Sequence, residues 1–173
     1  LDVRLLEKPA YAVEQSRLVA SVMADKSREA MDLAMELLHN FDEAKAEQVA
    51  QMETDVDRFE DELGTYLVKL SSKQLSNKDS ETLNTILHCI GDFERISDHA
   101  VNVVECVQQM QKEDAKFSKK AEEEMNIYSK AVRDILERTT GAFINTDIPL
   151  ARSVEPLEEV IDHHSFKKAV LST

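Results

Sequence analysis

The stretch Val49–Leu70, VAQMETDVDRFEDELGTYLVKL, decides the fold. Its apolar side chains recur every three or four residues, at Val49, Met52, Val56, Phe59, Leu63, Leu67 and Leu70. Because an α-helix turns once every 3.6 residues, this spacing places all of them on one face of a long helix. The stretch therefore predicts an amphipathic helix that buries this face against other helices.

The same periodicity predicts four more helices, over about 9–40, 79–111, 118–143 and 147–161. We expect Asp42 to cap the helix that contains Val49–Leu70, and Asp79 or Ser80 to cap the next one. The residues predicted to face inward are Val13, Val19, Val22, Met23, Met31, Ala34 and Leu38 in the first helix, Leu83, Ile86, Ile90, Phe93, Ser97, Ala100, Val101 and Val104 in the third, and Met125, Tyr128, Val132, Ile135 and Leu136 in the fourth. Gly91 inside the third helix suggests close helix packing at that point. Helices of this length joined by short loops are typical of an antiparallel helical bundle, so we expect an all-α fold.

The composition excludes several classes of protein. With 21 Lys and Arg against 34 Asp and Glu, the 173-residue chain has a formal net charge of −13 and should repel nucleic acids. Three Gly and three Pro are too few turn-forming residues for an all-β or alternating α/β chain. No apolar run is long enough to insert into a membrane. The first residue is Leu1, so we expect the chain to be part of a longer protein. Cys89 and Cys106 are expected to be reduced and to pack as small buried side chains.

Three Glu-x-x-x-Asp pairs stand out among the acidic residues: Glu53 with Asp57, Glu94 with Asp98, and Glu158 with Asp162. In each helix the Glu lies about 70 to 75° from the middle of the apolar face and the Asp about 110 to 115°, on the same side. Each pair therefore lies along the edge of a packing face, where neighbouring helices can bring carboxylates together. A metal ion bound by oxygen ligands would offset the repulsion, and such sites suit iron, manganese, magnesium or calcium. A solvated acidic face with ordinary ion pairs is the alternative.

Other chemical motifs are scarce. Only Glu36-Leu37-Leu38-His39 has the Glu-x-x-His form of ferritin-like oxidases, which need two such motifs. His99 follows Asp98 directly and is a candidate outer partner of a metal ligand, whereas we expect His163 and His164 to lie at the surface. The sequence has no Gly-rich phosphate loop, Cys-x-x-Cys, His-Glu-x-x-His or Gly-x-Ser-x-Gly motif. An enzyme is therefore the weaker interpretation.

The segment Gly91–Val103, GDFERISDHAVNV, closely resembles the signature of PhoU-like proteins, whose form is approximately Asp-Leu-Glu-Arg-Ile-Gly-Asp-His-Ala-x-Asn-Ile. The segment Glu53–Glu60, ETDVDRFE, is similar to the other Glu-x-x-x-Asp helix of that family. Ser97 stands where the family usually has Gly. The resemblance covers about residues 8–111, and more weakly 118–162.

The PhoU resemblance implies two tandem three-helix bundles, 9–111 and 118–173, each holding a metal cluster. The metal is usually iron, with zinc, manganese, magnesium and calcium as alternatives. Carried over residue by residue, Glu53, Asp57, Glu94 and Asp98 would line the first cluster, and Glu158 and Asp162 would belong to the second. Since 41 residues separate Glu53 from Glu94, a partner motif for Glu158 is expected near position 199, beyond Thr173. The second bundle is thus incomplete, and residues beyond Thr173 or another chain, as in a homodimer, would have to complete it.

The N-terminal segment Leu1–Arg17 is similar to the segment that joins the membrane part of bacterial sodium/phosphate cotransporters to their C-terminal PhoU-like domain. This resemblance implies that residues 1–8 are a linker from the membrane region of a cell-membrane protein, with the chain on the cytoplasmic side. Its partner would be the membrane half of the same transporter, whose phosphate uptake it modulates. A free-standing PhoU-type regulator that docks on a transporter or sensor kinase is the alternative, and a metal-dependent enzyme is the least favoured one.

Overall fold

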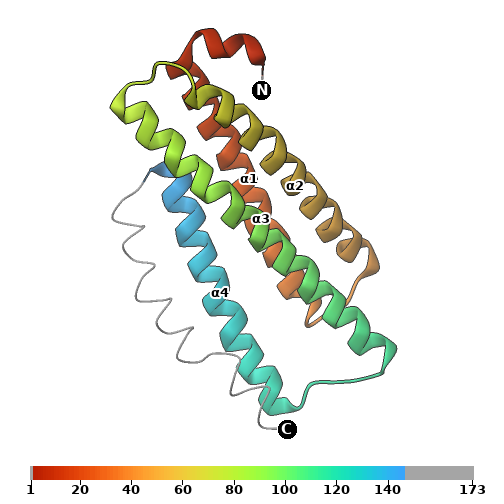
Figure 1. Cartoon of the computed structure of the whole chain (residues 1–173). Helices are drawn as coiled ribbons and strands as arrows, with labels where there is room; N and C mark the ends of the chain where they lie inside the picture. Colours follow the sequence, from red (N-terminus) through yellow and green to blue (C-terminus); the bar gives the residue numbers. More distant parts are fainter. Residues whose placement is uncertain (1, 147–173) are drawn as a thin grey trace. The chain divides into compact units, whose positions relative to one another are not determined.

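The computed structural model of the chain describes residues 2–146, which form a short 3₁₀ helix and four long α-helices (Figure 1). These are η1 (Val3–Glu7), α1 (Pro9–Leu37), α2 (Glu43–Ser71), α3 (Asn77–Lys112) and α4 (Lys119–Asn145). No strand occurs between residues 2 and 146, so the predicted all-α fold is confirmed. None of the helices in this range combines the length and the apolar character that crossing a bilayer requires. The helix predicted over 147–161 lies outside the described residues.

The chain divides into two compact units, Leu1–Val104 and Glu105–Thr173. The first unit contains η1, α1, α2 and most of α3. Within it, α1, α2 and α3 lie side by side as a three-helix bundle, and successive helices run in opposite directions (Figure 1). The second unit contains all of α4 and the last turns of α3.

The core of the first unit is made by one face from each helix. Most residues of the predicted faces of α2 and α3 are buried, whereas Met52, Phe59 and Val101 are half-buried. The buried residues are Val49, Val56, Leu63, Leu67, Leu70, Leu83, Ile86, Ile90, Phe93, Ser97, Ala100 and Val104. The buried face of α1 is different, because small residues fill most of it: Ala12, Ser16, Ala20, Ala24, Ser27, Ala30 and Ala34 have no exposed surface. Small side chains leave room for neighbouring helix backbones to approach closely. The hydroxyls of Ser16 and Ser27 donate to the carbonyl oxygens of Ala12 and Ala24, so this face carries no unpaired hydroxyl.

Capping side chains set where the helices begin. The carboxylate of Asp42 accepts from the amides of Ala44 and Lys45 at the start of α2, as predicted. For α3, the hydroxyl of Ser76 accepts from the amide of Asp79, so the helix begins two residues earlier than we expected and Ser76 takes the capping role. Ser118 caps α4 through the amide of Ala121. The prediction for α1 was right at Pro9 but three residues too long at the other end.

Four expectations about packing were wrong or only partly right. Val22, predicted to face inward, is 55% exposed, because alanine and serine rather than the large apolar residues mark the buried face of α1. A methyl group at Gly91 would meet no atom within 4 Å, so no helix packs closely there. Gly91 shares a face of α3 with Glu94, three residues on, and both residues are half-buried at the edge of the core. Cys89 is half-buried and Cys106 is exposed, so only the first of the two thiols is partly enclosed.

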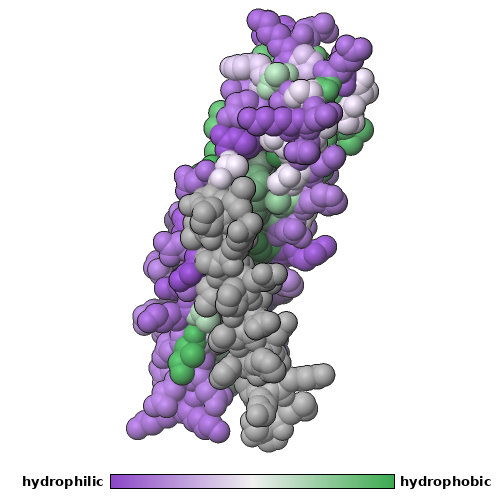
Figure 2. Space-filling model, turned by 90° about the vertical axis from the view of Figure 1, so that its left-hand side faces the viewer, coloured by the Kyte–Doolittle hydropathy of each residue, from purple (hydrophilic) through white to green (hydrophobic). Residues whose placement is uncertain are grey.

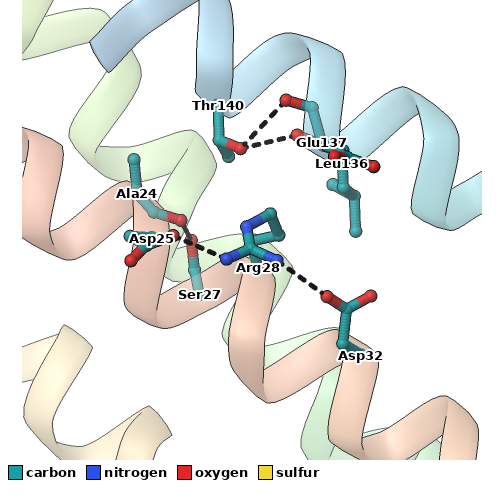
Figure 3. Close-up of polar contacts among 8 residues, drawn as sticks. All are labelled: Ala24, Asp25, Ser27, Arg28, Asp32, Leu136, Glu137 and Thr140. Carbon is teal, nitrogen blue, oxygen red and sulfur yellow. Dashed lines mark hydrogen bonds and ion pairs between the residues drawn. The ribbon is translucent and has the colours of Figure 1, made fainter.

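The second unit has a less enclosed helix. In α4, Leu136 is buried, and the other residues predicted to face inward, Met125, Tyr128, Val132 and Ile135, are half-buried. The buried hydroxyl of Thr140 donates to the carbonyl oxygen of Leu136, 2.7 Å away (Figure 3).

Most of the coloured surface in Figure 2 is hydrophilic, in keeping with a chain in which 32% of the residues are charged.

Candidate functional site

Four carboxylates from α2 and α3 interact electrostatically where the two helices meet in the first unit. We call these four, together with Glu53 on the same face of α2, the acidic seam. Three come from α2 (Glu53, Asp57 and Glu60) and two from α3 (Glu94 and Asp98). Within each helix they stand three or four residues apart and therefore share a face. The two helices are in contact beside them, since a methyl group at Gly64 would lie 3.7 Å from Cδ1 of Ile90.

The pKa of Glu94 is affected by carboxylates of both α2 and α3. Burial raises the pKa of Glu94 above its ordinary value of 4.5, and the negative charge of Asp98 raises it further. The carboxylates of Glu60 and Asp57, on α2, add to the increase in this pKa. Of the predicted residues, the structure therefore brings Asp57, Glu94 and Asp98 together.

Two α2 residues differ from the sequence-based expectation. Glu53 shares the face of Asp57 but is not among the groups that raise the pKa of Glu94, and its carboxylate accepts a hydrogen bond from Thr54 at 3.4 Å. Glu60 was not predicted as a site residue, although its spacing of three residues from Asp57 places it on the same face. That spacing was the available signal, but acidic residues are so frequent in this chain that it did not stand out.

Among residues 2–146, ion pairs neutralise several acids of the first unit but none of the acidic seam. Between α1 and α2, the ammonium of Lys26 lies 2.7 Å from the carboxylate of Asp55. On α1, Arg28 pairs with both Asp25 and Asp32, at 2.7 and 2.9 Å (Figure 3). In contrast, no Lys or Arg between residues 2 and 146 forms an ion pair with any of the five seam carboxylates. Ion pairs within the described part of the chain therefore do not account for this cluster.

The seam has the chemistry of a site for a hard cation, because carboxylate oxygens are the ligands that iron, manganese, magnesium and calcium accept. Within the described residues, however, no three His, Cys, Asp or Glu side chains are grouped so as to hold a metal ion. His99 is exposed, and no hydrogen bond or ion pair joins it to Asp98 in this part of the chain. The donor set thus fits a cation, whereas these side-chain positions do not yet form a coordination sphere.

The remaining predicted site residues cannot be placed. Glu158 and Asp162 lie outside the described residues, as do His163 and His164.

Comparison with protein families gives one match, to the PhoU domain, over residues 20–107. The matched region is just over half of the chain, runs from α1 to the last turns of α3, and includes every carboxylate of the acidic seam. Searches of curated proteins and of solved structures found no match. The PhoU match favours a regulatory role in phosphate uptake rather than catalysis. The chain belongs to the PhoU domain family.

Proposed function

We propose that the chain is the cytoplasmic regulatory domain of a sodium-dependent phosphate cotransporter and modulates phosphate uptake by the membrane half of the same protein. The observation that carries the regulatory role is the PhoU domain match across the three-helix bundle of the first unit. The link to a cotransporter rests on the similarity of Leu1–Arg17 to the segment that precedes the PhoU-like domain in such transporters.

The contacts of the N-terminal segment support a mechanical link between the membrane half and the bundle. Leu6 in η1 is buried against the first unit, with 7% of its surface exposed. The hydroxyl of Tyr66 on α2 donates to the carbonyl oxygen of Asp2, 3.4 Å away. A segment that enters from a membrane half would thus be attached to α1 and α2 from its first residues, so a displacement of η1 would act directly on the bundle.

We further propose that the acidic seam holds a metal ion, with iron as the first candidate and zinc, manganese, magnesium and calcium as the others. Asp57, Glu94 and Asp98 would hold it, with Glu53 and Glu60 on the same edge. The support is that burial and then the neighbouring carboxylates raise the pKa of Glu94, and that no ion pair in the described residues offsets their negative charge. A bound cation would neutralise this charge. Glu158 and Asp162 are proposed as ligands of a second site.

The regulatory role can be tested by measuring sodium-dependent uptake of radioactive phosphate in cells that produce the intact protein. We expect uptake by wild type to change with the phosphate supply during growth. The double variant Glu94→Gln/Asp98→Asn should keep sodium-dependent uptake but lose that response. The matched control Glu105→Gln changes an exposed carboxylate on the same helix and should behave as wild type. An unaltered response in the double variant at equal protein level would remove the acidic seam from the regulation.

The alternatives make different predictions. The coding sequence upstream of Leu1 separates a fused domain from a free-standing PhoU-type regulator, because a fused membrane segment excludes the second. Sustained hydrolysis of a phosphate ester that is lost in Glu94→Ala would instead support a metal-dependent enzyme. Sedimentation of the chain tests the homodimer.

A further inference from the structure

A pocket of about 640 Å³ opens on the first unit where η1, α1 and α2 adjoin. Its apolar lining includes Val3 of η1, Val19 of α1, and Phe59 and Tyr66 of α2. Three charged residues of α2, Asp61, Glu62 and Lys69, line it as well, and all three are exposed. Phe59, Glu62 and Tyr66 lie on the side of α2 opposite the acidic seam, whereas Asp61 is about 40° from Asp57 around the helix axis and borders the seam.

An exposed apolar stripe on α1 continues from the pocket. Tyr11, Leu18 and Val22 are 53%, 45% and 55% exposed. They stand seven and four residues apart, so they share one face of α1. Val19, in the pocket, is about 60° from Val22 around the helix axis. Stripe and pocket therefore form one apolar surface, which we call the α1–α2 docking surface.

The dimensions of this surface suit a helix. The stripe from Tyr11 to Val22 extends about 16 Å along α1, at 1.5 Å per residue. Three turns of a partner helix cover the same length. An apolar side chain from such a helix would fill the pocket in the way that anchor residues fill helix-binding grooves.

The charges around the pocket decide the kind of partner. The pocket lining has two carboxylates, Asp61 and Glu62, against one ammonium, Lys69, so its charge is negative. Among the described residues, no cation forms an ion pair with Asp61 or Glu62. The chain as a whole has a net charge of −13. Electrostatic repulsion disfavours a second copy of the chain, which would bring another net charge of −13 to this surface. An anionic membrane would also repel the chain. A partner that carries Lys or Arg beside its apolar residues is complementary to both the apolar surface and its negative charge.

We propose that the α1–α2 docking surface binds a basic amphipathic helix of a partner protein. Its apolar face packs on Tyr11, Leu18 and Val22, one side chain enters the pocket, and its Lys or Arg side chains meet Asp61 and Glu62. This inference does not depend on a metal at the acidic seam.

The test uses the full chain and a fluorescently labelled 18-residue helical peptide of Leu and Lys, with binding followed by fluorescence anisotropy. We expect the peptide to bind, and Leu18→Ser and Val22→Ser each to weaken the affinity about tenfold. The control Val68→Ser alters an equally exposed apolar residue of α2 that does not line the pocket, and it should leave the affinity unchanged. The double variant Asp61→Lys/Glu62→Lys should also weaken binding and reduce its dependence on salt. All five substituted positions are exposed, and circular dichroism checks that each variant folds.

Several results would overturn the proposal. One is equal binding of the Leu and Lys peptide by wild type and by Leu18→Ser and Val22→Ser. Another is equally tight binding of a Leu and Glu peptide of the same length, which would remove the charge argument. Self-association of the chain that is abolished by Val22→Ser would identify a second copy as the occupant. Binding to phosphatidylglycerol vesicles that is lost in the same variant would identify a membrane instead.

Discussion

Replacing Glu94 with Gln should stabilise the metal-free chain at neutral pH, although it removes a predicted functional residue. Glu94 is partly buried, and the carboxylates of Asp98, Glu60 and Asp57 raise its pKa, so its ionised form is disfavoured in the folded state. Glutamine has nearly the same size and helix propensity as glutamate but carries no charge. The substitution therefore removes repulsion with little other change.

The size of the effect follows from the neighbouring charges. Like charges four residues apart, as in Glu94 and Asp98, cost about 0.2 to 0.5 kcal/mol on an exposed helix. The two carboxylates from α2 act in the same sense, which brings the expected gain in the free energy of unfolding to about 0.5 to 1 kcal/mol. For a chain of this size such a gain raises the melting temperature by about 1 to 4 °C.

The gain should depend on pH with a defined sign. Because the folded-state pKa of Glu94 is raised, the folded state holds this proton more tightly than the unfolded state does. The stability from this proton is fully present below the unfolded value near 4.5 and is lost as the pH rises through the folded pKa. The advantage of Glu94→Gln should therefore be seen at neutral pH and shrink toward zero in acid.

The assay is thermal unfolding of chelator-treated protein, followed by circular dichroism between pH 4 and pH 8. Glu105→Gln serves as the control, since Glu105 is an exposed carboxylate on the same helix. Adding iron or manganese should raise the melting temperature of wild type, because a ligand that binds the folded state stabilises it, and this increase should be lost in Glu94→Gln. A metal-free Glu94→Gln protein that melts below wild type at neutral pH would refute the reasoning.

Two other substitutions test the packing of the first unit. Gly91→Ala should raise the free energy of unfolding by about 1 kcal/mol, because Gly weakens a helix interior and the added methyl group meets no atom within 4 Å. Chemical denaturation measures this change, and a loss of stability would mean that another helix packs at this point. Lys26→Met should lower stability by up to about 1 kcal/mol at low salt, and by less in 1 M salt, since it breaks the partly exposed pair with Asp55. The pKa of Asp55 is lowered mainly by the hydrogen bond from Lys26. In Lys26→Met this pKa should rise toward 3.8, which NMR titration would measure. An unchanged pKa would assign the shift to the hydrogen bond from Gln51.

The sequence by itself determined the helices and their faces, because helix periodicity and capping are local. The spacing from Val49 to Leu70 needs no information from the rest of the chain, and Asp42 caps α2 through amides two and three residues away. The same locality placed Glu94 and Asp98 one turn apart on an edge of α3. The motif around them was specific enough to indicate the PhoU domain family, which the match over residues 20–107 confirms.

Only the tertiary structure decided which faces meet. It placed Glu60 near Glu94, although 34 residues separate them, because that proximity depends on how α2 lies against α3. It also left Val22 exposed and Gly91 open, since the burial of a residue depends on its neighbours on other helices as well as on its own hydropathy. The small residues of α1 illustrate the reason: alanine and serine carry little hydrophobic signal, yet they occupy the core because only small side chains allow the helices to approach so closely.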